Sequence, residues 1–100
     1  MAGFQEAMAK NRPIAIHVRT VDGPICKAQH LVLDRLMKEP GFADYIVFEI
    51  DFPSQPNAVA MTGAKLPATL IFHRGQTEVG RLTGISDESA IRSLLTKTAP

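Results

Sequence analysis

The sequence has only one cysteine, Cys26, among its 100 residues. A single thiol excludes an internal disulfide and any zinc site made of several cysteines. Neither charge sign dominates, and the net charge of +1 gives no electrostatic reason to expect binding to nucleic acid or an anionic membrane. No apolar run approaches the length of a membrane span, and the N-terminal part lacks a signal-peptide core. These absences leave the compartment open: a cytoplasmic location fits the chain as written, and an exported mature form fits equally.

The length and composition indicate one folded domain over residues 1–100. A chain of 100 residues is long enough to bury a core without disulfides or metal ions as staples. Its hydrophobic fraction of 45% and charged fraction of 21% are ordinary for globular proteins. The sequence contains no internal repeat and no low-complexity linker.

The hydrophobic periodicity predicts alternating helices and strands. In chain order we expect a short helix ending near residue 10, a strand at 14–19, a helix at 24–38 and a strand at 45–51. These are followed by a short helix at 57–62, two strands at 68–73 and 77–82, and a final helix capped by Ser86 or Asp87. A strand–helix–strand crossover followed by a hairpin at Arg74-Gly75 gives a mixed four-stranded sheet with helices on both faces. The predicted fold class is therefore α/β.

The helix at 24–38 has the most informative start. Gly23 suits the N-cap, Pro24 fits the first helical position, and Cys26 then falls in the first turn. The helix dipole and the free backbone N–H groups of that turn favour a thiolate, whereas burial disfavours one. Helical spacing predicts that the residues facing the sheet are Ala28, Leu31, Val32 and Leu36.

Two segments of the chain resemble the thioredoxin family. That family places a Cys-X-X-Cys pair and a lysine at the start of a helix, and a cis-proline ahead of a later strand. Cys26-Lys27 matches the second cysteine with its lysine, Pro67 matches the cis-proline, and Gly75 matches the glycine of the following hairpin. The resemblance covers nearly the whole chain and implies a thioredoxin-like fold. It also places Gly23 at the position of the first, attacking cysteine.

The resemblance therefore implies a degenerate site without ordinary dithiol exchange, because that exchange needs one thiol to attack and another to resolve. A shifted alignment would place Asp22 at the attacking position, and aspartate is not a thiol either. In the family, the residue before the cis-proline, here Leu66, offers its backbone to an extended client peptide. The residues expected to bind such a client are Val21, Asp22, Gly23, Pro24, Ile25, Leu66 and Pro67.

Cys26 and His17 each have two interpretations. Cys26 is either a small core residue inherited from a redox ancestor or a single thiol that forms mixed disulfides with glutathione or a client. His17 stands where thioredoxins commonly have a buried aspartate. It is either a base or partner for the Cys26 thiol or a neutral interior histidine held by a hydrogen bond.

Further polar residues suggest weaker hypotheses. His30 could join Cys26 and His17 as a metal ligand, but the three lack a tight spacing pattern, so no metal site and no cofactor are predicted. His73 is expected at the surface. Residues 84–87, Gly-Ile-Ser-Asp, resemble the segment with which glutaredoxins hold glutathione, and a simple helix cap explains them equally well.

Three functional hypotheses follow. The favoured one is a client-binding or accessory member of the thiol-disulfide oxidoreductase superfamily that has lost dithiol catalysis. The alternative is a single-thiol oxidoreductase acting through Cys26, with glutathione as a candidate partner. A structural domain of a larger assembly is the third, and whether the chain is an enzyme stays open.

Overall fold

The structure is a computed structural model and describes residues 2–99. Helices and strands alternate in the predicted order, with one added 3₁₀ turn, η1, in which Phe42 is buried. The elements are α1 (Ala2–Ala9), β1 (Pro13–Arg19), α2 (Pro24–Met37), η1 (Pro40–Phe42), β2 (Ile46–Asp51), α3 (Pro56–Thr62), β3 (Thr69–Arg74), β4 (Thr77–Thr83) and α4 (Glu88–Thr98).

The four strands form one mixed sheet in the order β2-β1-β3-β4. β1 runs parallel to β2 and antiparallel to β3, and β3 and β4 form the predicted antiparallel hairpin. β1 is central, and six of its seven residues are buried, which explains its nearly continuous apolar sequence. The predicted α/β fold class and sheet are confirmed.

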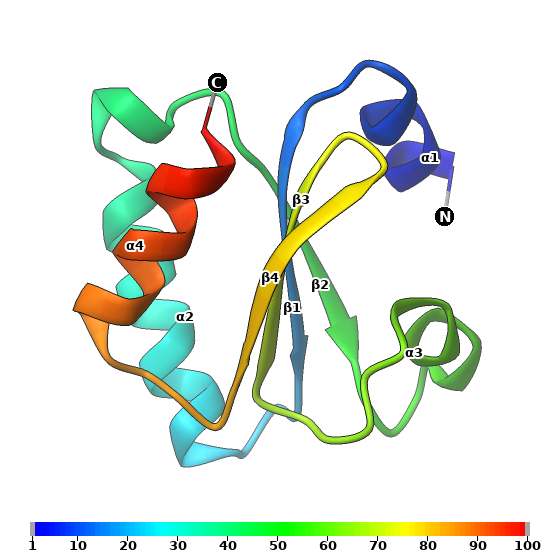
Figure 1. Cartoon of the computed structure of the whole chain (residues 1–100). Coiled ribbons are helices and arrows are strands. Elements are labelled where there is room, and N and C mark those ends of the chain that lie inside the picture. Colours follow the sequence, from blue (N-terminus) through cyan, green and yellow to red (C-terminus); the bar gives the residue numbers. More distant parts are fainter. Residues whose placement is uncertain (1, 100) are drawn as a thin grey trace.

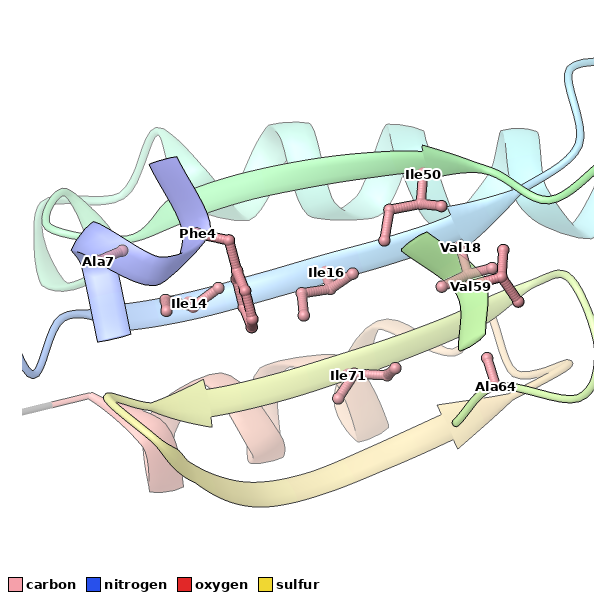
Figure 2. Packing of buried hydrophobic residues seen from close by; sticks show 9 residues of the cluster. All are labelled: Phe4, Ala7, Ile14, Ile16, Val18, Ile50, Val59, Ala64 and Ile71. Atoms are coloured by element: carbon pink, nitrogen blue, oxygen red, sulfur yellow. The ribbon is translucent and has the colours of Figure 1, made fainter. Parts of the chain in front are cut away.

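Two helices cover each face of the sheet. In Figure 1, α2 and α4 lie on the left face, and α1 and α3 lie on the right face. Because side chains alternate along a strand, β1 supplies both layers. Figure 2 shows Ile14, Ile16 and Val18 of β1 directed into the layer that also contains Phe4 of α1 and Val59 of α3. Ala15 and His17, the intervening residues, belong to the layer beneath α2 and α4.

The predicted inner face of α2 is partly wrong. Leu36 is buried as expected, but Leu31 is 65% exposed and Leu33 takes its place in the core. The residues of α2 that face the sheet are Cys26, Gln29, Leu33 and Leu36. Their spacing is helical, but the second of them is a glutamine, a residue type that is usually exposed. The apolar pattern alone therefore placed the inner face too far around the helix.

None of the helices in residues 2–99 is both long enough and apolar enough to cross a membrane.

The two leucines allow a direct test of this orientation of α2. Leu33→Ala should lower the free energy of unfolding by about 2–5 kcal/mol, because it removes buried methyl groups and leaves a cavity. Leu31→Ala removes the same atoms from an exposed position and should change it by less than about 0.5 kcal/mol. Urea denaturation measures both variants. Equal losses of unfolding free energy in the two variants would contradict the observed orientation of α2.

Candidate functional site

The candidate site lies at one edge of the sheet. β1 ends there, β3 begins there and β4 ends there, since Val18 pairs with Thr69 and Thr69 pairs with Thr83. The start of α2, the loop before β3 and the loop after β4 all lie at the lower end of the molecule in Figure 1. Segments that are far apart in sequence therefore meet around Cys26.

The start of α2 has the predicted geometry. Gly23 is the N-cap, with an extended backbone at φ −71° and ψ 124°, and Pro24 opens the helix. The first turn is closed by the Lys27 N–H, which donates to the Gly23 carbonyl at 2.9 Å. Cys26 lies in this turn, but its side chain is buried, with 4% of the residue exposed.

Gly23 lies close against the thiol. A Cβ atom at this position would stand 3.4 Å from the Cys26 Cβ and 3.1 Å from its Sγ. Cβ atoms joined through a disulfide are about 3.5–4.5 Å apart, so residues 23 and 26 have nearly the spacing that a disulfide needs. The same Cβ would stand 2.7 Å from the Thr20 Oγ1, so any side chain at position 23 requires Thr20 to move.

A pocket of about 380 Å³ opens beside Cys26. Apart from Cys26, its walls are Arg19, Thr20, Val21, Lys27, His30, Leu31 and Glu49. The thiol has one weak polar contact, with the Thr20 hydroxyl at 3.9 Å. Cys26 is therefore a wall of the pocket rather than a group that projects into solvent.

His17 is completely buried and is held by Gln29. The His17 Nε2 and the Gln29 Oε1 are 2.9 Å apart. The Gln29 Nε2 donates to the carbonyl oxygens of Ala68 and Ile85, each at 2.9 Å. Since carbonyl oxygens only accept, the Gln29 oxygen must face the histidine, and the His17 Nε2 must carry the proton.

The other ring nitrogen of His17, Nδ1, is buried and has no hydrogen-bond partner. With the proton on Nε2, Nδ1 carries a free lone pair. Burial lowers the pKa of His17 below its usual value, an effect opposed mainly by the hydrogen bond with Gln29 and the charge of Glu49. The ring is therefore neutral at physiological pH. The structure does not bring it into hydrogen-bond contact with Cys26, although a pairing of these two residues was one sequence-based hypothesis.

Glu49 connects His30 and Arg19 at the pocket. Its Oε1 is 3.1 Å from the His30 Nδ1, and its Oε2 accepts from the Arg19 Nη2, also at 3.1 Å. Glu49 faces His17 across the β1–β2 pair, because the two residues are partners in the sheet register. Glu49 was not predicted from the sequence; its signal was a charged residue within the apolar run at 46–50.

The prediction of a cis peptide bond before Pro67 is wrong. Residues 2–99 contain no cis peptide bond, so the bond between Leu66 and Pro67 is trans. Instead, the chain reverses through Ala68, which has a left-handed φ of 58° that residues with a Cβ atom rarely adopt. The Gly84 N–H donates to the Ala68 carbonyl at 2.9 Å, and the Thr69 hydroxyl donates to the Leu66 carbonyl at 2.8 Å. These bonds and Gln29 hold the loop in its shape.

The predicted client-binding residues are mostly at the surface of this edge. Three large apolar side chains are exposed, Val21 at 64%, Ile25 at 44% and Leu66 at 59%. Asp22 and Pro24 are exposed, and Gly23 and Pro67 are half-buried. We name Val21, Ile25 and Leu66 the apolar rim.

The loop after β4 ends in a helix cap. The Asp87 side chain accepts the Ala90 N–H at 3.0 Å, which confirms Asp87 as the N-cap of α4. This carboxylate therefore serves the helix itself. His73, expected at the surface, is half-buried and packs edge-on against Phe4.

Comparison with known proteins identifies the class. No family model and no curated protein matches the chain, but many solved structures do. Trxlp from Edwardsiella tarda EIB202 is 32% identical, with a TM-score of 0.90 over 94% of this chain and 91% of that one. Thioredoxin from Malassezia sympodialis is 15% identical, with a TM-score of 0.85 over 99% of this chain and 88% of that one. Thioredoxin from Fasciola hepatica is 20% identical, with a TM-score of 0.82 over 97% of this chain and 92% of that one.

The fold is therefore that of the thiol-disulfide oxidoreductase superfamily. Within it, the chain belongs to the thioredoxin family, as the likeness to Trxlp over almost the full length of both chains shows.

Gln29 makes the site sensitive to one substitution. Gln29→Leu keeps the volume but leaves the His17 Nε2 and the Ile85 carbonyl without their partner, at about 1–3 kcal/mol for each unpaired group. We expect the free energy of unfolding to fall by roughly 2–6 kcal/mol and amide exchange in the loop after β4 to become faster. Urea denaturation and hydrogen-exchange NMR measure the two effects. The exposed Gln5 of α1 is the matched control, and Gln5→Leu should leave both unchanged; equal behaviour of the variants would contradict the role of Gln29.

Proposed function

We propose that the protein is a client-binding module of the thioredoxin family that holds an extended apolar segment of a protein at the apolar rim and does not catalyse dithiol exchange. The observation that carries the proposal is the exposed apolar rim at the edge of the sheet where the buried Cys26 lies. Val21, Ile25 and Leu66 come from two separate segments and expose large apolar side chains at the same edge of the sheet. Exposed apolar groups that gather at one place favour a binding surface.

The residue at position 23 supports the absence of catalysis. The sequence resemblance to thioredoxins leads us to expect the attacking thiol there, and this chain has Gly23. The remaining thiol, Cys26, is 4% exposed and has no second cysteine to resolve a mixed disulfide.

The backbone of Leu66 supports a side-chain mode of recognition. Its carbonyl already accepts the Thr69 hydroxyl, which leaves only one lone pair for an added strand. A client would therefore gain most from contact with the three apolar side chains.

Binding can be tested with an unreactive peptide. Reduced and alkylated insulin B chain is extended and apolar and cannot form a disulfide. NMR titration should shift the amide signals of the apolar rim, and Ile25→Asp or Leu66→Asp should weaken binding at least about tenfold, because a carboxylate would be desolvated against an apolar peptide. Met61 of α3 is about as exposed as the rim residues, and Met61→Asp is the matched control that should bind normally. Equal weakening by all three variants, or no shifts at the rim, would refute the proposal.

Catalysis can be restored if only the attacking thiol is missing. The natural chain should not accelerate insulin reduction by dithiothreitol, whereas Gly23→Cys should, because positions 23 and 26 already have nearly disulfide spacing. Gly23→Ser adds a side chain of similar size without a thiol and is the control. Thr20→Ala in both variants removes the Thr20 hydroxyl that the new Cβ would meet. Activity of the natural chain would contradict the proposal.

One observation favours the alternative of single-thiol chemistry. Cys26 lines the pocket, and Arg19 and Lys27, which also line it, supply positive charge for the carboxylates of glutathione. In that reaction Cys26 would attack oxidised glutathione, form a mixed disulfide and release one reduced glutathione. Mass spectrometry after incubation with oxidised glutathione distinguishes the two: an adduct that forms as fast in the folded as in the denatured chain would favour the alternative.

A further inference from the structure

Three possible metal ligands converge at the pocket: His30 and Glu49 are in its wall, and His17 is buried nearby. One donor atom from each of His17, His30 and Glu49 lies within 4.8 Å of the other two. The residues come from three different elements, β1, α2 and β2, so their spacing in the sequence gives no pattern to recognise. Their convergence is a property of the fold.

We propose that His17, His30 and Glu49 form a binding site for a divalent first-row transition ion such as Zn²⁺, with an open coordination position facing the pocket beside Cys26. This inference is independent of client binding at the apolar rim. Two imidazoles and one carboxylate are a donor set that suits such ions, and three protein ligands leave a position for water or another ligand.

The free lone pair of His17 is the first argument. Its Nδ1 is buried without a partner, although buried polar atoms are rarely left unpaired. The Gln29 oxygen fixes the proton on Nε2, which is how a buried residue commonly sets the tautomer of a metal-binding histidine. The amide of Gln29 is itself fixed by two carbonyls, so the orientation of the ring is defined before any ion arrives.

The mobility of the other two ligands is the second argument. Tetrahedral zinc with nitrogen or oxygen donors at about 2.0–2.1 Å places those donors roughly 3.3 Å apart. The His30 Nδ1 and the Glu49 Oε1 are already 3.1 Å apart. Their side chains are 54% and 37% exposed, so both can rotate toward the fixed His17.

Arg19 limits the affinity of this site. Its guanidinium donates to the Glu49 Oε2 through both Nε and Nη2, at 3.3 and 3.1 Å. This contact leaves Oε1 for the ion but places a positive charge beside it, and like charges repel. Removal of Arg19 should therefore tighten the binding of the ion.

The experiment is calorimetric titration of the untagged, chelator-washed full chain with Zn²⁺. We expect one ion per chain, and affinity at least about tenfold weaker in His30→Ala and in Glu49→Gln, since loss of a residue that only holds a ligand in place already costs this much. Arg19→Gln should bind more tightly than the natural chain. His73→Ala removes the remaining histidine, on the opposite face of the sheet, and Cys26→Ser removes the thiol; both should bind as the natural chain does.

His17 itself needs a measurement without substitution, because a buried variant can fail to fold. In ¹⁵N NMR spectra of the three imidazoles, Zn²⁺ should shift the Nδ1 signal of His17 and leave Nε2 protonated. Loss of binding in Cys26→Ser would show a thiolate site and overturn the proposed ligands. Absence of binding, an unmoved His17 signal, or weaker binding in Arg19→Gln would overturn it as well.

Discussion

The arrangement of the site depends on one buried amide. Gln29 donates two hydrogen bonds to the Ala68 and Ile85 carbonyls and accepts one from His17, so it joins α2 to β1 and to two loops. An unpaired amide in the interior is costly, and this cost fixes the rotation of α2 about its axis. Cys26 is one turn before Gln29 on the same helical face and is buried for that reason.

The Gln29 amide also affects the two groups that a redox mechanism would combine, the His17 ring and the Cys26 thiol. Because Gln29 determines that the His17 Nε2 donates, the only basic atom of that ring is Nδ1, and it makes no hydrogen bond with the Cys26 thiol. Cys26 has instead a weak contact with Thr20. A histidine in the interior of this fold thus acts first as a hydrogen-bond donor that anchors the helix. Its remaining lone pair, on Nδ1, has no hydrogen-bond partner.

The sequence predicted features that depend on neighbouring residues and missed features that depend on the folded chain. Gly23-Pro24 specified the start of α2, and Asp87 specified the start of α4, because a cap acts within one turn. Apolar periodicity could not predict that Leu33 rather than Leu31 is buried, since the buried face contains a glutamine. The trans bond at Pro67 also departs from the family pattern, and it accompanies a reversal at Ala68 that Gly84 and Gln29 hold from distant positions. Glu49 belongs to the site because the register of β1 and β2 places it opposite His17, and no local sequence pattern reveals that register.

The glycine at position 23 limits what this edge of the sheet can do. A glycine cannot attack a disulfide, and the apolar rim is exposed at the same edge. The pocket beside Cys26 has Arg19, His30 and Glu49 in its wall together with the apolar side chains of Val21 and Leu31. The buried Cys26 therefore lines a pocket that adjoins the apolar rim at Val21. Val21 belongs to both the apolar rim and the pocket, so a client at the rim and a small ligand in the pocket would contact the same residue.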